Sequence, residues 1–335
     1  MPFSIQTRHL VNGPEIRKIT GMKSEYRVGT RGSDLAMQQT ESIIAMMKQN
    51  YPDTGFSIVE IVTHGDRFQN KPITEMGEAV DRGIFNTALE QAVLKDEVDF
   101  ATCSFKDVET DLPQGLTAVS VGRREDHRDV LVSRHGVGLA DLPRGAVLAT
   151  SSPRRVSQLK AFRDDFNFEA LRGNVPTRVE KESKRFDGVV LAAAGMLRLG
   201  MQEHIAEYIP EEVLLSAPAQ AAMGCEYLSS RDDVARLVAS IQHPETELCV
   251  RLEKKLLIRL SGGCFAPIGV LAAVSGGNLR IRCRIVSLDG ARRVEDEITG
   301  EPAAGEALVE ELAGRIAGAG GLEIVRETRL ALQGS

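Results

Sequence analysis

Short apolar strands alternate with amphipathic helices between residues 26 and 194, and few folds accommodate this order. Residues 26–30 are typical of a strand, and Ser33 is typical of the N-cap of a helix that reaches about residue 50. The alternation indicates parallel sheets with helices on both faces, so we expect an α/β, doubly wound architecture. Further strands are predicted at 56–62, 98–103, 117–122, 130–132, 146–150, 168–171 and 188–194, and helices over 84–95, after Ser152-Pro153 and after Asn174.

The last hundred residues follow a different order. One long helix over 244–260 precedes three successive strands and a closing helix over 305–317. This is α+β order, which predicts a separate, smaller domain. A chain of 335 residues has the length of about two or three domains, and the polar residues 1–24 are expected to form a loose extension. The three strands are predicted at 268–274, 279–287 and 292–298.

Composition excludes several classes of function. The 41 basic and 47 acidic residues give a net charge of −6, which argues against non-specific nucleic-acid binding. The longest nearly apolar stretch, 189–197, is too short to span a bilayer, and the N-terminus lacks the apolar region of a secretion signal. Five widely spaced cysteines without C-x-x-C, and six histidines without metal-ligand spacing, disfavour disulfides and metal sites and fit a reducing cytoplasm.

Basic residues recur where predicted strands end and helices begin. Four such places carry them: Arg31, Lys106, the pair Arg154-Arg155, and Arg172. Ligands of open α/β sheets bind outside the carboxyl ends of the strands, where helix N-termini favour anions and arginine matches a carboxylate bidentately. A solvated surface role is the alternative at any single position. Repetition at four strand ends favours a crevice for a small ligand with several carboxylates or phosphates.

Two further residues have the chemistry of a reactive site. Asp107 follows Lys106, and a carboxylate among cations stays ionised; a structural salt bridge, stabilisation of a developing cation and proton transfer all fit its position. Cys264 lies in SGGCFAP, where two glycines allow close approach of the chain. Its thiol is either an exposed nucleophile or attachment point, or a small buried apolar group.

Several sequence motifs together match the pattern of a known family. VGTRGSDLA, VTHGD, RGIF, FKDV, DLPQGL, REDHRDVLVS, ATSSPRR, LRGNVPTR, LAAAGMLRLG and SGGCFAPIG occur in this order. With them the sequence resembles the porphobilinogen deaminase (hydroxymethylbilane synthase) family from about residue 26 to about residue 317. The resemblance implies two domains like periplasmic binding proteins with the active cleft between them, and a third, smaller α+β domain. The implied boundaries are 1–24 for the extension, 25–123 plus 220–240 for domain 1, 124–219 for domain 2 and 241–335 for domain 3.

The resemblance also implies a reaction. Porphobilinogen units are joined head to tail with release of ammonia, and hydroxymethylbilane is then freed by hydrolysis. The growing chain is built on a dipyrromethane cofactor, held by a thioether to the cysteine that Cys264 matches. The protein makes this cofactor itself. A cytoplasmic monomer without metal, nucleic acid or membrane partner is implied.

The resemblance also implies roles for individual residues of this sequence. Asp107 matches the catalytic aspartate, which stabilises positive charge on pyrrole nitrogens. The positions that match groups binding cofactor and substrate are Arg31, Ser33, Arg82, Ser104, Lys106, Thr150, Ser151, Ser152, Arg154, Arg155, Arg172, Gly173, Arg178, Arg198 and Gln220.

The sequence departs from the family pattern at three places. Cys103 stands where the family commonly has histidine, and Arg82 stands where it has lysine. Ala219-Gln220-Ala221 replaces Gly-Gln-Gly, and alanine does not readily take a positive φ. Altered hinge motion, substrate fit or chain-length control would follow. Two alternatives therefore stand beside a working deaminase: a specialised paralogue making an altered oligopyrrole, and a non-catalytic binder of anionic ligands on the same fold.

Overall fold

The computed structural model describes residues 7–8, 21–62, 87–171, 173–261 and 266–333. The chain divides into two compact units, each assembled from two separate stretches. The first unit comprises Met1–Arg124 and Ala222–Glu247, and the second comprises Glu125–Ala221 and Leu248–Ser335. The segments 124–219 and 241–335, expected as two domains, thus lie mostly in one unit, and the three-domain division stays a prediction.

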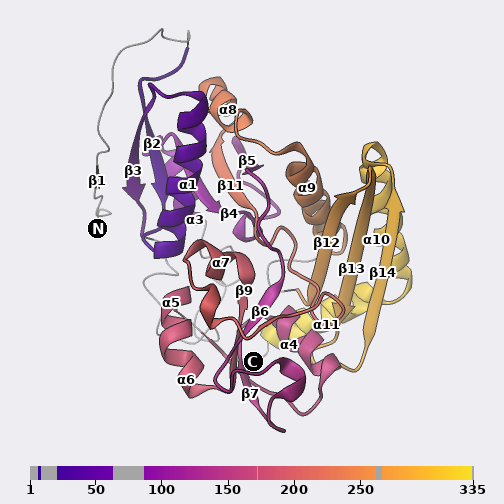
Figure 1. Ribbon diagram of the computed structural model, residues 1–335. Coiled ribbons are helices and arrows are strands. Elements are labelled where there is room, and N and C mark those ends of the chain that lie inside the picture. The colour runs from indigo at the N-terminus through magenta and orange to yellow at the C-terminus, as the bar shows by residue number, and fades with distance from the viewer. Residues whose placement is uncertain (1–6, 9–20, 63–86, 172, 262–265, 334–335) are drawn as a thin grey trace. The chain divides into compact units, whose positions relative to one another are not determined.

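The first unit is built on a six-stranded sheet in the order β1-β3-β2-β4-β11-β5 (Figure 1). β2 pairs parallel with β3 and β4, whereas β11 is antiparallel to both β4 and β5. The sheet is therefore mixed, because β11 reaches it from a distant part of the sequence. Its strands are β1 (Thr7–Arg8), β2 (Glu25–Thr30), β3 (Gly55–Glu60), β4 (Phe100–Ser104), β5 (Leu116–Val121) and β11 (Met223–Leu228).

Helices cover both faces of this sheet. Phe56 and Phe100 belong to the core shared with α1 and α8, while Val59 and Ala101, on the other face of the same two strands, pack with α3. Successive strand residues point to opposite faces, so this partition confirms the doubly wound arrangement. The helices are α1 (Asp34–Asn50), α3 (Thr87–Leu94), the short 3₁₀ turn η3 (Phe105–Asp107) and α8 (Asp232–Ala239).

The second unit contains a five-stranded sheet in the order β10-β6-β9-β7-β8. β7 is parallel to β8 and β9, but β6 is antiparallel to β9, so this sheet is also mixed. The strand predicted to reach residue 194 ends at Ala192, because Ala193 begins a helix. The elements are β6 (Asp129–Ser133), η4 (Leu139–Asp141), β7 (Val147–Ala149), α4 (Pro153–Phe162), β8 (Asn167–Glu169), α5 (Val175–Thr177), η5 (Arg178–Glu182), α6 (Ser183–Arg185), β9 (Gly188–Ala192), α7 (Ala193–Arg198), η6 (Gln202–His204) and β10 (Glu207–Tyr208).

A three-stranded antiparallel sheet completes the second unit. Its apolar face, including Ile268, Ile281 and Ile285, forms one core with buried residues of the helices α9, α10 and α11. Its other face carries Arg280, Arg282 and Arg284, which alternate with the apolar residues of β13. The elements are α9 (Pro244–Arg259, of which the residues from Leu248 on belong to this unit), β12 (Ile268–Ser275), β13 (Asn278–Val286), β14 (Arg293–Gly300), η7 (Pro302–Ala304), α10 (Gly305–Gly318) and α11 (Gly321–Gln333).

The α/β class with a smaller α+β part is confirmed by these sheets. Helix α11 was not predicted, because the Gly-rich sequence before it interrupts the helical pattern: Gly320 has φ +90° and separates α11 from α10. No helix in the described ranges is long and apolar enough to cross a membrane.

Candidate functional site

In the first unit, two predicted site segments meet at one edge of the sheet. β2 ends at Thr30, directly before Arg31, and β4 ends at Ser104, directly before Lys106 and Asp107 in η3. β2 and β4 are parallel neighbours, with Val28 opposite Phe100, so their carboxyl ends lie at the same edge. This edge is where ligands of open α/β sheets bind.

A chain of buried hydroxyl groups, which sequence reasoning missed, fixes this edge. The Thr40 Oγ1 atom lies 2.7 Å from Thr30 Oγ1 and 2.6 Å from Thr102 Oγ1, and so joins α1 to β2 and β4. Ser33 caps α1 as predicted, its hydroxyl accepting from the Ala36 N–H group at 3.4 Å. Threonine in strands is common, so the sequence carried no signal for this contact.

Asp107 differs from its neighbours because its carboxylate has no assigned partner. The side chain is partly buried, yet it makes no hydrogen bond or ion pair with any described residue. The nearby Ser104 hydroxyl, by contrast, is bound to the buried Gln39 amide at 3.1 Å. A salt bridge to Lys106, one of the roles considered from the sequence, is therefore not formed among the described residues. The carboxylate is available to an N–H donor or a developing cation.

In the second unit, hydroxyl groups shape the start of α4. Ser152 is the N-cap and accepts from the Arg155 N–H group at 3.5 Å, while Thr150 Oγ1 accepts from the Ser152 N–H group. The Ser151 hydroxyl donates to the Leu171 carbonyl at 2.8 Å and accepts from the Leu171 N–H group at 2.9 Å. These contacts hold the loops after β7 and β8 together. Binding of ligand by the three hydroxyl residues stays a prediction.

Two of the predicted ligand-binding arginines have an internal partner. Arg154 Nη1 lies 2.8 Å from Asp129 Oδ2, and Arg155 Nη2 lies 2.7 Å from Asp129 Oδ1. Asp129 is fully buried; burial alone would raise its pKa, but the two guanidinium groups hold the pKa well below its usual range. Asp129 was not among the predicted site residues, although it begins an apolar strand within the REDHRDVLVS motif.

The buried pair is extended by backbone and amide contacts. Arg154 Nη1 donates to the Leu215 carbonyl at 2.7 Å, and Arg155 Nη1 donates to the Val190 carbonyl at 2.8 Å. The predicted site residue Gln220 also reaches Asp129, its Nε2 donating to Oδ1 at 3.1 Å. The geometry therefore assigns Arg154 and Arg155 a structural task, and their contact with ligand carboxylates stays a prediction.

Arg178 and Arg198 have a different environment. Arg178 Nε donates to the Gly173 carbonyl at 2.7 Å, and Gly173 presents that carbonyl with a φ of +102°. Burial, with repulsion from Arg155, lowers the pKa of Arg178 to about 10, and no described carboxylate pairs with it. Arg198 Nη2 donates to the Ala221 carbonyl at 2.6 Å; burial lowers its pKa, which Glu125 partly opposes.

This part of the second unit consequently has an excess of positive charge. Arg154, Arg155 and Arg178 are three cations with one carboxylate, Asp129, in ion-pair contact among the described residues. A desolvated cation without a counter-charge is costly, and an anionic ligand offsets that cost. The predicted residues Arg82, Arg172 and Cys264 lie outside the described residues.

The two alanines of the Ala219-Gln220-Ala221 segment adopt the conformation that favours glycine. Ala219 has φ +61° and Ala221 has φ +74°. The expectation that alanine would avoid this region is wrong here, because surrounding contacts hold the backbone: Glu253 Oε2 accepts from the Ala219 N–H group at 2.6 Å, and Arg198 holds the Ala221 carbonyl. The left-handed region costs an L-residue about 1–2 kcal/mol, so this turn is strained.

Comparison with known proteins matches the chain to two family profiles. Residues 26–236 match the profile described as porphobilinogen deaminase, dipyromethane cofactor binding domain, and residues 247–318 match that of the porphobilinogen deaminase C-terminal domain. A relative named porphobilinogen deaminase, from Syntrophomonas wolfei, is 39% identical over 304 residues, covering 90% of this chain and 98% of its own. Another of that name, from Pelotomaculum thermopropionicum, is 40% identical over 309 residues, covering 92% and 98%.

Among solved structures, a periplasmic binding protein of Salmonella typhimurium with high arginine specificity matches this chain with a TM-score of 0.38. It is 12% identical, and the match covers 65% of this chain and 92% of that protein.

Proposed function

The chain belongs to the porphobilinogen deaminase family, and we propose that it is a working member: a transferase that condenses porphobilinogen head to tail with release of ammonia and hydrolyses the product to hydroxymethylbilane. A dipyrromethane group on Cys264 supplies the primer to which the substrate units are joined. A cytoplasmic monomer is part of the same proposal. The family resemblance supports the monomer, and the wide spacing of an odd number of cysteines supports the reducing cytoplasm.

The unpaired carboxylate of Asp107 is the observation that carries this proposal. Loss of ammonia from porphobilinogen leaves an electron-poor ring carbon, and attack on it places positive charge on pyrrole N–H groups. A fixed carboxylate stabilises such charge best when no internal cation already neutralises it. Asp107 meets that condition, since it has no described partner and follows a strand held by the Thr40 hydroxyl contacts.

The second unit supports the proposal through its cations. Each porphobilinogen carries an acetate and a propionate, so primer and growing chain are polyanions. Arg178 is partly buried without a carboxylate partner, and Arg198 is only partly offset by Glu125. This donor set fits an oligopyrrole with several carboxylates, and Arg178 and Arg198 would hold those groups in place. The internally paired Arg154 and Arg155 would keep the start of α4 in shape for the same ligand.

The backbone of residues 219–221 bears on the paralogue alternative. That alternative rested on Ala219 and Ala221, together with Arg82. Both alanines adopt the left-handed φ that glycine adopts readily, so the replacement does not prevent this segment from taking that conformation. This favours the ordinary tetrapyrrole product over an altered oligopyrrole.

Intact mass of the denatured protein, measured beside Cys264→Ala, tests the proposal. We expect a covalent adduct of two condensed pyrrole units on the wild type and none on the variant. Incubation with porphobilinogen should then yield hydroxymethylbilane, identified by chromatography. An unmodified wild type that stays unmodified with substrate would instead indicate the non-catalytic binder, and a product of different length would indicate the paralogue.

A further inference from the structure

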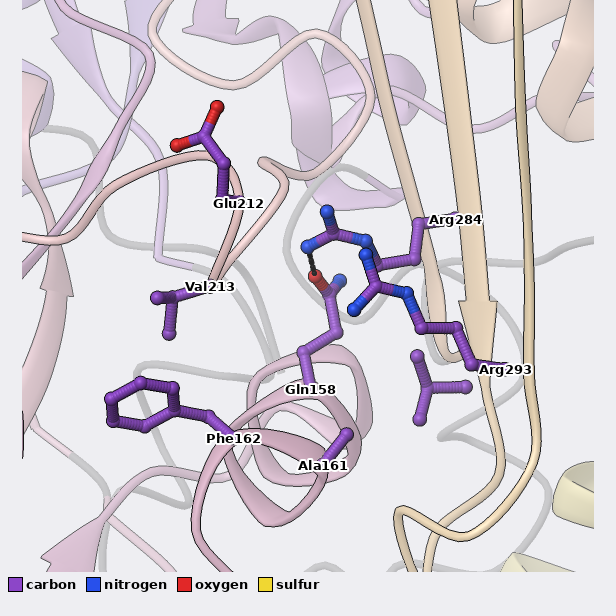
Figure 2. A pocket seen from close by; sticks show the side chains of 8 residues that line it. Gln158, Ala161, Phe162, Glu212, Val213, Arg284 and Arg293 are labelled. Atoms are coloured by element: carbon purple, nitrogen blue, oxygen red, sulfur yellow. Dashed lines mark hydrogen bonds between the residues drawn. The ribbon is translucent and has the colours of Figure 1, made fainter.

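A cavity lies in the second unit, where α4 meets the polar face of β13 and β14 (Figure 2). Its volume is about 170 Å³. Its apolar lining residues are Ala161, Phe162, Val213 and Val286, and its polar lining residues are Gln158, Glu212, Arg284 and Arg293. None of these residues is assigned to the proposed active site.

The apolar lining suits a small ring or branched chain. Phe162, the last residue of α4, keeps 39% of its surface exposed and lines the cavity together with Val213. An apolar cavity of about 150 Å³ is large enough to bind benzene. The cavity therefore accommodates a ligand body of that size against Phe162 and Val213.

Arg284 forms a fixed part of the polar lining. It is 1% exposed, and its Nε and Nη2 atoms donate to the Glu295 carboxylate at 2.9 Å each. Its Nη1 donates to Gln158 Oε1 and to the Glu211 carbonyl, both at 3.0 Å. These donors are used internally, so Arg284 shapes the lining and adds charge to it.

Arg293 is the group that remains able to bind a ligand. Its side chain is 48% exposed, and its Nε and Nη2 atoms pair with Glu295. Its Nη1 atom has no partner among the described residues. Figure 2 shows the Arg293 guanidinium beside Gln158 and Arg284, across the cavity from Phe162 and Val213.

Arg293 shares its carboxylate partner with two other arginines. Glu295 serves three guanidinium groups, those of Arg282, Arg284 and Arg293. Burial would raise the pKa of Glu295, but Arg284 and Arg293 lower it to about 2, so the carboxylate stays charged. A ligand carboxylate at the Nη1 side of Arg293 would give this guanidinium a partner that it does not share.

Glu212 restricts the ligand further. Its side chain is 78% exposed, and Figure 2 shows its carboxylate directed away from Gln158. Negative charge at this rim disfavours a second carboxylate on the ligand. We propose that this cavity is a second binding site, which takes a small amphipathic monocarboxylate: its carboxylate on Arg293, its apolar body against Phe162 and Val213. This inference does not depend on the proposed function, whose substrate carries two carboxylates.

Titration with 3-phenylpropionate, followed by backbone amide NMR shifts on the full chain, tests the site. We expect saturable shifts at residues around Gln158, Val213 and Leu215. The neutral analogue 3-phenylpropanamide should bind at least about tenfold more weakly, because a hydrogen bond to a charged group is lost. Arg293→Gln should weaken binding of 3-phenylpropionate to a similar extent. Val213→Trp should abolish binding by filling the cavity.

Arg292→Gln is the matched control. Arg292 is exposed, pairs with Glu327 and does not line the cavity, so binding should be unchanged. Arg293 is also half-exposed, so its variant tests the site even if Val213→Trp fails to fold. Equal affinity of the wild type and Arg293→Gln, shifts confined to residues near Arg178, or no shifts at millimolar ligand would overturn the proposal.

Discussion

Replacing Ala219 by glycine should cost almost no stability, although Ala219 is fully buried. Three contributions decide the result. Relief of the left-handed strain gains about 1–2 kcal/mol. Loss of the buried methyl group costs about 0.8 kcal/mol, and the greater freedom of glycine in the unfolded chain costs about 0.4–1 kcal/mol. The gain and the two losses nearly cancel, so the expected change in the free energy of unfolding is close to zero.

Ala146→Gly supplies the comparison. Ala146 lies in a loop of the same unit, is 2% exposed and does not have a positive φ. Glycine there gains nothing from strain relief, so we expect a loss of about 1.2–1.8 kcal/mol from the two costs alone. Ala221→Gly, at φ +74°, should behave like Ala219→Gly.

The assay is urea unfolding followed by circular dichroism, because the chain has no tryptophan whose fluorescence could report unfolding. The quantity of interest is the difference between Ala219→Gly and Ala146→Gly, about 1–2 kcal/mol, which is the strain itself. If both variants lose the same stability, the backbone at Ala219 is not strained.

Three other predictions follow from the same structure. Asp107→Ala should lower kcat for porphobilinogen consumption by a factor on the order of 100–1,000, with an unchanged circular dichroism spectrum; a variant keeping most of its activity would refute the electrostatic role. Arg178→Gln should weaken retention of the oligopyrrole or raise KM, whereas the exposed Arg185→Gln should change neither. Burial would raise the pKa of Asp99, but hydrogen bonds from Lys23, Arg27 and Arg231 lower it from 3.8 to about 2. The ionised Asp99 therefore adds stability that is complete above about pH 4 and is lost as the pH falls through 2. Asp99→Asn should flatten this part of the acid unfolding curve, and an unchanged curve would contradict the prediction.

Local signals predicted the elements that position the site. Ser33 caps α1, Ser152 caps α4 with Pro153 at its first position, and Asn174 caps α5, because each cap needs one side chain and one nearby N–H group. β11 escaped prediction because Gly224 and Glu226 interrupt its apolar pattern, and only its pairing with β4 and β5 on both sides makes it a strand. The mixed character of both sheets has the same origin, since strand direction depends on pairing over long sequence distances.

The ion-pair partners of the charged residues in the site could not be predicted from the sequence. Arg155 and Arg178 both match family positions that bind cofactor and substrate, so the resemblance implies one role for both. The structure separates them, because Asp129 pairs with Arg155 but not with Arg178. A buried arginine with a buried carboxylate is electrostatically complete, whereas one without it attracts an anion from outside. The decisive residue is thus the acidic one, and its signal in the sequence is a single aspartate at the start of an apolar strand, which only the fold brings to the arginines.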